Sequence, residues 1–529
     1  MNIVLLCSSF NSLTQAIYTK LKDKSYNPKV LYAIDVEKIP SLKPDIILCP
    51  FLKSYLPANI YKNYPTYILH PGPIGDRGAS SLEYALEKKE WGIVWLRANE
   101  ELDAGDIYAE VEFKVRDTYK ASLYRQEVVQ SALKGLDKLL EYKSKKQILN
   151  PLHQPFGQEM RKIDWQKNTT KQIIKIIHQA DSQPGVLDEI LGVKCYLFGI
   201  WREDKFRGKS KEILAKRDGA ICLGTIDGAV WITHLKEPNQ FKLPATYVLK
   251  DRLSGIKEDR LPLLFNKTYE TFYETSVEFR DDVAYLCFNF HNGALSSAQC
   301  IRLKYAVDYL KEKCKVLVLV GGMDFFSNGI HLNILEDSQK QGEDGWANIN
   351  AMNDLIKSIL FADEIVTVAS LARNAGAGGV FMALACDYVV SKEGVVLNPH
   401  YETLGLTGSE YHTFTLPKRV GKDKANELLK SCMPISVYEA KKIGMIDEVF
   451  SHKDYYEKLH EFAKNFYDNN FIQNKQEFLE ENRERIESLK EKELEVMHPE
   501  FWNKKSSFHK LRKEFVYKIC PTTTPKRFI

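Results

Sequence analysis

Short apolar runs alternate with amphipathic segments over the first part of the chain. Residues 2–9 are almost continuously apolar, and the run at 13–22 that follows has the spacing of an amphipathic helix. Three further apolar runs lie at 29–35, 44–51 and 65–72. This alternation, with a closing helix over 122–142, predicts a parallel sheet with helices on its faces. Ligands bind such sheets at the carboxyl ends of the strands.

The middle of the chain has a different pattern. Between residues 160 and 265, short β-like runs are separated by Gly, Asp and Pro, which predicts a small β-barrel or sheet. A second α/β unit follows, where apolar runs at 283–290 and 315–322 enclose a helix predicted over 297–313. From Tyr455 onward the chain is charged, and we expect it to be largely helical.

These patterns together predict a multidomain α/β protein. The predicted parts are a Rossmann-like domain over 1–155, a small β-barrel-like domain over 156–265, a connector over 266–280, an α/β domain over 281–455 and a helical C-terminal region over 456–529. The length of 529 residues supports this division, because one hydrophobic core rarely serves so long a chain.

Charge and cysteine content narrow the classes of partner. The net charge is +4, from 74 basic and 70 acidic residues, which gives no case for a nucleic-acid or anionic-membrane partner. The ten cysteines form no CxxC pair and no metal-ligand spacing, so they are interpreted as buried apolar residues of a reducing compartment. No apolar run approaches the roughly 18 residues of a membrane span. We therefore expect a cytoplasmic protein without a metal site.

A loop rich in proline and glycine, HPGPIGDRGASS (70–81), follows the apolar run at 65–72. His70 stands at the carboxyl end of a predicted strand, and Asp103 stands in a D-x-G turn. An aspartate beside a histidine can orient the ring and keep it protonated, as acid–base work at a carbonyl requires. Each residue taken alone is more often structural. Arg77 has two open interpretations: an ion pair with its neighbour Asp76, or a contact that steadies the turn or a ligand carboxylate.

Three stretches, FLKSYLP (51–57), HPGPIGDRGASS and ELDAGDI (101–107), resemble the 10-formyltetrahydrofolate-dependent formyltransferases. The resemblance implies that His70 and Asp103 are catalytic. It also implies folate-binding roles for Leu52, Pro71, Arg77 and Asp106. The asparagine of the family's N-x-H motif is replaced by Ile68, which puts the usual carbonyl-polarising amide in doubt. RKIDW (161–165) resembles the barrel that follows the catalytic domain in methionyl-tRNA formyltransferase.

Two glycine-containing loops, at 321–333 and 374–387, follow predicted strands of the second α/β unit. Such loops can direct two backbone N–H groups at one carbonyl oxygen, whereas close helix packing by small residues is the alternative. Their motifs, FFSNGIHL and AGAGGVF, resemble those of the enoyl-CoA hydratase/isomerase (crotonase) family. This resemblance spans 282–452. It implies a coenzyme A thioester whose carbonyl oxygen is held by the backbone N–H groups of Asn328 and Gly378.

The departures from the crotonase pattern bear on the chemistry. The two glutamates with which hydratases add water fall at Phe381 and Tyr401, so water addition is not expected. Tyr401, Glu402, Glu410 and Tyr411 lie near where the family keeps a Gly-rich loop. A glutamate in an apolar cavity can have a raised pKa and move a proton, and a tyrosine can donate a hydrogen bond to it. The alternative for each of these residues is ordinary packing or surface exposure.

The two resemblances together predict a relay of a one-carbon unit. The formyl group of 10-formyltetrahydrofolate is passed to coenzyme A, and formyl-CoA then breaks down to carbon monoxide and coenzyme A, with Glu410 and Tyr401 as catalytic residues. The two-part layout resembles a family of hydrogenase maturation proteins that make the CO ligand of [NiFe] hydrogenase, which implies other maturation proteins as partners. Two alternatives stay open: a formyltransferase that acts on an amine, and a non-catalytic scaffold that binds coenzyme A.

Overall fold

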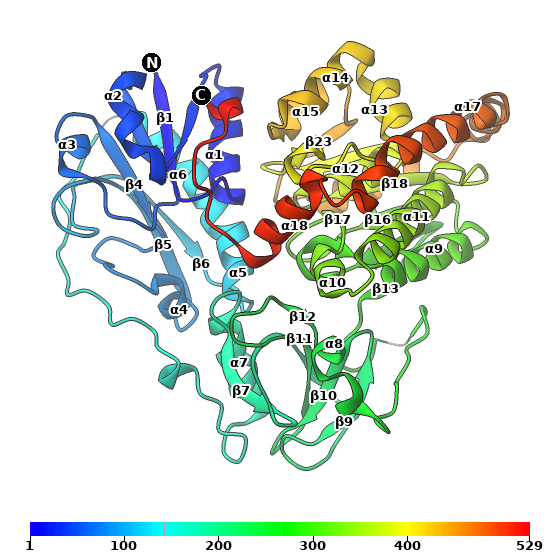
Figure 1. The fold of residues 1–529 in the computed structure, drawn as a ribbon, viewed down its shortest axis with the longest axis horizontal. Coiled ribbons are helices and arrows are strands. Elements are labelled where there is room, and N and C mark those ends of the chain that lie inside the picture. Colours follow the sequence, from blue (N-terminus) through cyan, green and yellow to red (C-terminus); the bar gives the residue numbers. More distant parts are fainter. Residues whose placement is uncertain (142, 266) are drawn as a thin grey trace. The chain divides into compact units, whose positions relative to one another are not determined.

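The structure is a computed structural model that describes residues 1–141, 143–265 and 267–529. Its internal contacts divide the chain into two units (Figure 1). Unit 1 contains residues 1–261, 267–272 and 521–529, and unit 2 contains residues 262–265 and 273–520. Within the described residues, none of the helices combines the length and the apolar character that crossing a bilayer requires.

Unit 1 begins with a six-stranded sheet in the order β2-β1-β3-β4-β5-β6. Its strands are β1 (Ile3–Cys7), β2 (Lys29–Tyr32), β3 (Ile46–Cys49), β4 (Thr66–His70), β5 (Glu90–Arg97) and β6 (Ile107–Lys114). The first four are parallel, as the apolar runs predict, and β5 and β6 are antiparallel additions. Strands β1 and β3 are buried along their whole length, which explains their continuous apolar sequence.

Helices cover this first sheet, and only part of the helix predicted over 122–142 is one continuous α-helix. The helices are α1 (Ser12–Asp23), α2 (Ile39–Leu42), α3 (Ala58–Tyr61), α4 (Ser81–Ala85), α5 (Lys120–Leu123) and α6 (Val129–Leu139). A π-helical turn over Tyr124–Val128 joins α5 to α6. The predicted end at Tyr142 lies outside the described residues.

The second part of unit 1 is an antiparallel sheet, which confirms the small β-structure predicted there. Its strands are β7 (Val186–Ile190), β8 (Val193–Glu203), β9 (Ile213–Arg217), β10 (Ala220–Gly224), β11 (Ala229–Lys236) and β12 (Leu243–Pro244). Helix α7 (Thr170–Ala180) begins with a capping box between Thr169 and Gln172 and packs Ile173 and Ile177 into the core of this sheet. The short helix α8 (Ala245–Leu249) packs on the same core.

The last residues of the chain belong to unit 1, so the helical C-terminal region predicted over 456–529 is wrong for 521–529. The backbone N–H of Thr524 donates to Asp35 at 2.5 Å, and the Thr524 hydroxyl accepts from the backbone of Tyr32 at 2.9 Å. Phe528 is buried, with its ring 4.7 Å from that of Phe10. These contacts attach the end of the chain to the edge of the first sheet at β2.

Replacing Phe528 by alanine is expected to destabilise this edge of unit 1 by about 3 kcal/mol, because the change removes a buried aromatic ring. Hydrogen–deuterium exchange of β1 and β2 should become faster. Lys526→Ala, at an exposed position of the same turn, should leave the exchange unchanged. Unchanged protection of β2 in the Phe528 variant would show that the tail does not support the sheet.

Unit 2 is built on a second six-stranded sheet, in the order β13-β14-β16-β18-β20-β23. Its strands are β13 (Thr275–Arg280), β14 (Val283–Phe288), β16 (Val316–Val320), β18 (Val366–Leu371), β20 (Tyr388–Lys392) and β23 (Glu448–Phe450). All neighbours are parallel except β13 and β14. The connector predicted over 266–280 is wrong in its second half, because β13 pairs along its full length with β14.

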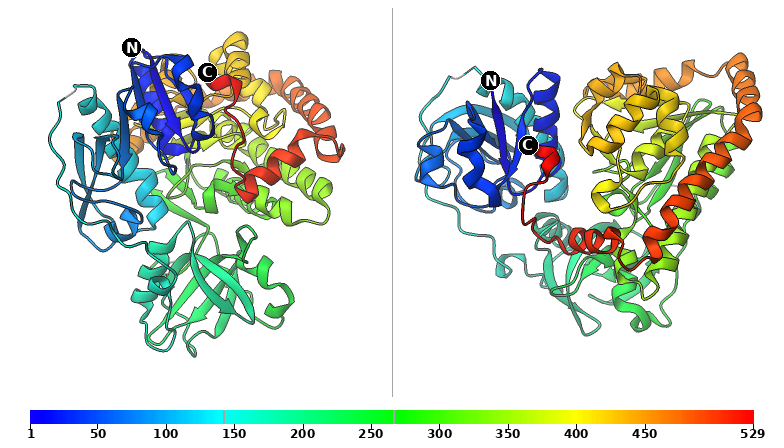
Figure 2. Two further views of the ribbon diagram at one scale, coloured as in Figure 1. Left: turned by 60° about the vertical axis from the view of Figure 1, so that its left-hand side comes forward. Right: turned by 45° about the horizontal axis from the view of Figure 1, so that its top comes forward.

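Short strand pairs and ten helices complete the described part of unit 2. The short strands are β15 (Ala294–Leu295), β17 (Gly329–Ile330), β19 (Ala375–Gly376), β21 (Val396–Asn398) and β22 (Ile435–Ser436). The helices are α9 (Ser297–Lys311), α10 (Leu332–Asp337), α11 (Gln341–Leu360), α12 (Gly378–Leu384), α13 (His412–Val420), α14 (Lys422–Ser431), α15 (Val437–Lys442), α16 (Tyr455–Asn465), α17 (Asn469–Trp502) and α18 (Ser507–Tyr517). The long helix α17 runs beside α11 and also contacts α13 (Figure 2).

Candidate active sites

The first candidate site lies at the carboxyl end of β4, where His70 is the last residue of the strand. His70 is buried, and its Nδ1 lies 3.4 Å from the Asp103 carboxylate. Asp103 comes from the turn between β5 and β6 and has a φ of +51°, a left-handed conformation that aspartate tolerates better than most residues. The fold therefore brings together the histidine and aspartate that the sequence singled out.

The D-x-G turn depends on its glycine. A Cβ added at Gly105 would lie 1.6 Å from the backbone oxygen of Arg97, so no other residue fits without moving the strand. The Asp103 carboxylate also accepts from the backbone N–H of Gly78 at 3.0 Å, which ties the 70–81 loop to this turn. Arg77 reinforces the same connection, donating to the backbone oxygen of Leu102 at 3.1 Å.

Asp76 occupies a position that the sequence did not indicate. It does not pair with Arg77, whose ionic partner is Glu101 at 3.3 Å. Its carboxylate instead lies between two histidines, 2.6 Å from Nε2 of His70 and in contact with Nε2 of His153. Burial alone would raise the pKa of Asp76, but the hydrogen bond and charge of His70 hold it below its usual range. Both nitrogens of His70 thus face carboxylates.

The residues assigned to folate binding have different surroundings in this structure. Leu52 packs on the apolar cluster beside β1 and β3. The backbone oxygen of Pro71 accepts from Ser81 and Trp91, and Asp106 is exposed. Neither Leu52 nor Asp106 forms a hydrogen bond or ion pair with His70 in the described part of the chain. Their roles stay predictions, and His153 is a residue that sequence reasoning missed, since nothing in its extended segment singles it out.

The second candidate site lies at the start of α12 in unit 2. Gly378 is the first residue of this helix, and the first N–H groups of a helix have no partner within it. The backbone N–H of Asn328, by contrast, donates to the backbone oxygen of Gly293 at 2.7 Å. The predicted use of the Asn328 N–H as a thioester donor requires this bond to open, and the roles of Asn328 and Gly378 both stay predictions.

Glu410 and Tyr401 meet against the start of α12. The Tyr401 hydroxyl donates to the Glu410 carboxylate at 2.6 Å, so of the tyrosines in this segment it is Tyr401 that forms the expected kind of hydrogen bond. A Cβ added at Gly378 would lie 2.7 Å from the Glu410 carboxylate, so this group lies directly beside the helix start. The rings of Phe381 and Tyr401 stack with centroids 5.2 Å apart. Phe381 and Tyr401, which stand at the two positions where hydratases carry glutamates, therefore form a stacked aromatic pair.

The electrostatics of this pair suit proton transfer. Glu410 is 2% exposed and has a left-handed backbone, with a φ of +64°. Burial raises its pKa, against the opposing hydrogen bond from Tyr401. Burial and the Glu410 charge also raise the pKa of Tyr401 well above its usual value. Glu410 is thus a carboxylate that is readily protonated, and Tyr401 is a neutral hydrogen-bond donor.

His412 and Glu493 extend the site and were missed by the sequence analysis. The His412 ring lies 5.5 Å from those of Phe381 and Tyr401, and its Nδ1 lies 3.2 Å from Glu493 of α17. Glu493 also accepts from the backbone N–H of Thr413 at 2.7 Å. His412 stands close to Glu410 in the sequence, so it could have been found. Glu493 is one of many acidic residues in a long helix and gave no signal.

Replacing Glu493 by glutamine is expected to lower the pKa of His412. Burial would lower this pKa, but the hydrogen bond and charge of Glu493 raise it. With a raised folded-state pKa, the pair stabilises the fold fully below pH about 6.5, and this stabilisation is lost as the pH rises through the folded-state value. A histidine NMR titration measures the shift. Glu495→Gln, exposed on the same helix, is the control, and an unchanged His412 titration in the Glu493 variant would refute the coupling.

The fold and these sites define a protein class: a formyltransferase-like unit joined to a crotonase-like unit. Family models support both parts. The formyl transferase C-terminal domain matches residues 156–252, and enoyl-CoA hydratase/isomerase matches residues 280–518. A 4-chlorobenzoyl coenzyme A dehalogenase of Arthrobacter is 28% identical over 36% of this chain and 71% of its own. In the described residues, no group of histidine, cysteine and acidic side chains is arranged to hold a metal ion.

Two relatives match the whole chain. The hydrogenase maturation factor HoxX of Bradyrhizobium diazoefficiens is 32% identical, over 99% of this chain and 96% of its own. The crystal structure of HypX from Aquifex aeolicus in complex with tetrahydrofolic acid is 40% identical, with a TM-score of 0.97, and the match covers 100% of this chain and 98% of that one. The chain therefore belongs to the HoxX/HypX family of hydrogenase maturation factors.

Proposed function

We propose that the protein transfers the formyl group of 10-formyltetrahydrofolate to coenzyme A and then converts formyl-CoA to carbon monoxide and coenzyme A. The carbon monoxide would serve as the ligand of the [NiFe]-hydrogenase iron, delivered with the help of other maturation proteins. Membership of the HoxX/HypX family and the tetrahydrofolate complex of the Aquifex relative support this proposal. Both substrates are small molecules, and the cytoplasm is the compartment in which we expect them to be used.

The first step belongs to unit 1. The coenzyme A thiolate attacks the formyl carbon, the carbon–nitrogen bond breaks, and the folate nitrogen takes a proton. His70, oriented by Asp103, is suited to supply that proton and to stabilise charge on the formyl oxygen. In the present arrangement Nε2 of His70 is bound to Asp76, so this contact must open before the ring acts on a substrate through that nitrogen.

The second step belongs to unit 2. Formyl-CoA has no α-carbon, so enolate chemistry of the crotonase type is not available to it. Glu410 removes the formyl proton, the carbon–sulfur bond breaks, and the electron pair of the C–H bond becomes the lone pair of carbon monoxide. The thiolate takes a proton, which Glu410 or Tyr401 would supply. The N–H of Gly378 would hold the carbonyl oxygen.

The observation that carries the proposal is the buried carboxylate of Glu410, held by Tyr401 against the start of α12 where hydratases would activate water. The test is to incubate the protein with 10-formyltetrahydrofolate labelled with ¹³C in the formyl group and with coenzyme A. We expect ¹³CO, detected with reduced haemoglobin. Formylation of an added amine without CO would replace the proposal with an amine formyltransferase. Retention of coenzyme A without turnover would replace it with a scaffold.

A further inference from the structure

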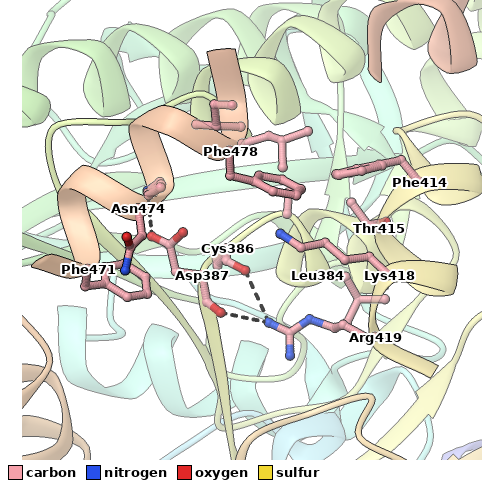
Figure 3. A pocket seen from close by; sticks show the side chains of 14 residues that line it. Leu384, Cys386, Asp387, Phe414, Thr415, Lys418, Arg419, Phe471, Asn474 and Phe478 are labelled. Atoms are coloured by element: carbon pink, nitrogen blue, oxygen red, sulfur yellow. Dashed lines mark hydrogen bonds and ion pairs between the residues drawn. The ribbon is translucent and has the colours of Figure 1, made fainter. Parts of the chain in front are cut away.

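A pocket of about 330 Å³ opens between α12, α13 and α17 of unit 2 (Figure 3). It lies at the end of α12 opposite to the one at the second candidate site, and residues along α13 from Phe414 to Arg419 also line it. Leu384, near the end of α12, lines the pocket, whereas Gly378 begins that helix at the site. Glu410 and Tyr401 do not line it. The pocket is therefore distinct from the proposed thioester site.

The charged groups around this pocket carry more positive than negative charge. Asp387 forms an ion pair with Lys475 at 2.7 Å, and Arg419 forms one with Asp447 at 3.0 Å. The carboxylates of Asp387 and Asp447 are therefore each paired with another basic residue. For Lys418, no carboxylate of the described residues lies within ion-pair distance. One positive charge thus faces the pocket without a matching negative charge.

Aromatic and aliphatic side chains form most of the remaining wall, with Thr415 and Asn474 as its polar members. The Lys418 ammonium lies 4.4 Å from the centroid of the Phe478 ring and 5.7 Å from that of Phe414, and Lys418 as a whole is exposed. Figure 3 shows this ammonium pointing between the two helices that carry these rings. Partial desolvation lowers the pKa of Lys418, the charge of Asp387 raises it, and the smaller effect of Arg419 lowers it. An anion placed beside the ammonium would oppose the two effects that lower this pKa.

We propose that this pocket binds a small organic anion, with one carboxylate or phosphate group held by Lys418 and a flat apolar body packed against Phe414 and Phe478. The volume lies at the small end of the range found for ligand pockets. A charge-assisted hydrogen bond to the ammonium and apolar contact with the two rings supply the two interactions that such a molecule needs. The excess positive charge disfavours a cation. A neutral ligand would leave Lys418 without a partner.

The test uses 2-naphthoate as the probe and isothermal titration calorimetry on the full chain. Binding to the wild-type protein should be about tenfold tighter than binding to Lys418→Met, which keeps the apolar stem but removes the charge. The neutral isostere 2-naphthamide should also bind about tenfold more weakly than 2-naphthoate. Lys422→Met, at an exposed position at the start of α14, should bind the probe as the wild type does.

A second variant tests the location independently of charge. Asn474 is exposed and lines the pocket, so Asn474→Trp should fill the space without disturbing the core and should abolish binding. Circular dichroism checks that both pocket variants are folded. The proposal is overturned if 2-naphthoate does not bind, if Lys418→Met or Asn474→Trp binds it as well as the wild type does, or if 2-naphthamide binds equally. None of these outcomes depends on the proposed formation of carbon monoxide.

Discussion

Replacing Glu410 by glutamine should lower the rate of carbon monoxide formation from added formyl-CoA by about 10²–10⁴-fold, the range typical of a lost general base. Glutamine keeps the size of the side chain and can still accept the hydrogen bond from Tyr401. Only the ability to take the formyl proton is removed. The measurement is the rate of CO release, followed with reduced haemoglobin. We expect formyl-CoA to accumulate in the variant when 10-formyltetrahydrofolate and coenzyme A are supplied.

The pH profile separates this role from a structural one. Because burial raises the pKa of Glu410, the wild-type rate should rise with pH through a value above the ordinary range of a glutamate. This rise of the rate with pH should be absent from the residual activity of Glu410→Gln. Glu402→Gln, an exposed change in the same segment, should keep the wild-type rate and profile. A Glu410 variant that retained full activity would eliminate the proposed decarbonylation site.

Replacing His70 by glutamine should give the complementary defect. Transfer of the formyl group from 10-formyltetrahydrofolate should fall by about 10²–10⁴-fold, because the imidazole that exchanges the proton is lost. Carbon monoxide formation from added formyl-CoA should be unaffected, since Glu410 lies in unit 2. Glutamine can still donate to the Asp76 carboxylate, which limits the loss of stability. Release of tetrahydrofolate measures the first step, and haemoglobin measures the second.

The matched control is His178→Gln, which changes a half-buried histidine of unit 1 that does not contact Asp76 or Asp103. Its only ion-pair partner in the described residues is Asp117. We expect both steps to continue at the wild-type rate in this variant. Equal loss of both steps in His70→Gln would show that the substitution damages the protein as a whole. Normal release of tetrahydrofolate would remove His70 from the mechanism.

The sequence alone determined the two α/β units, because buried parallel strands must be continuously apolar and the helices between them amphipathic. It also indicated His70 and Asp103, since a strand end and a D-x-G turn place polar groups at a sheet edge. Glu410 and Tyr401 could be identified from the sequence for a similar reason, because they replace residues within a recognisable motif. All four depend on local sequence signals. The strand β13 was missed because its polar, edge-strand sequence resembles a connector.

Only the tertiary structure decided which distant groups complete each site. Asp76 lies between His70 and His153 because an extended segment returns across the loop, and no local pattern encodes that return. Glu493 reaches His412 from a long helix in which acidic residues are frequent, so its burial depends on packing rather than on its type. The free energy of a buried charge is set by its partners, and partners far apart in the chain become known only once the chain is folded.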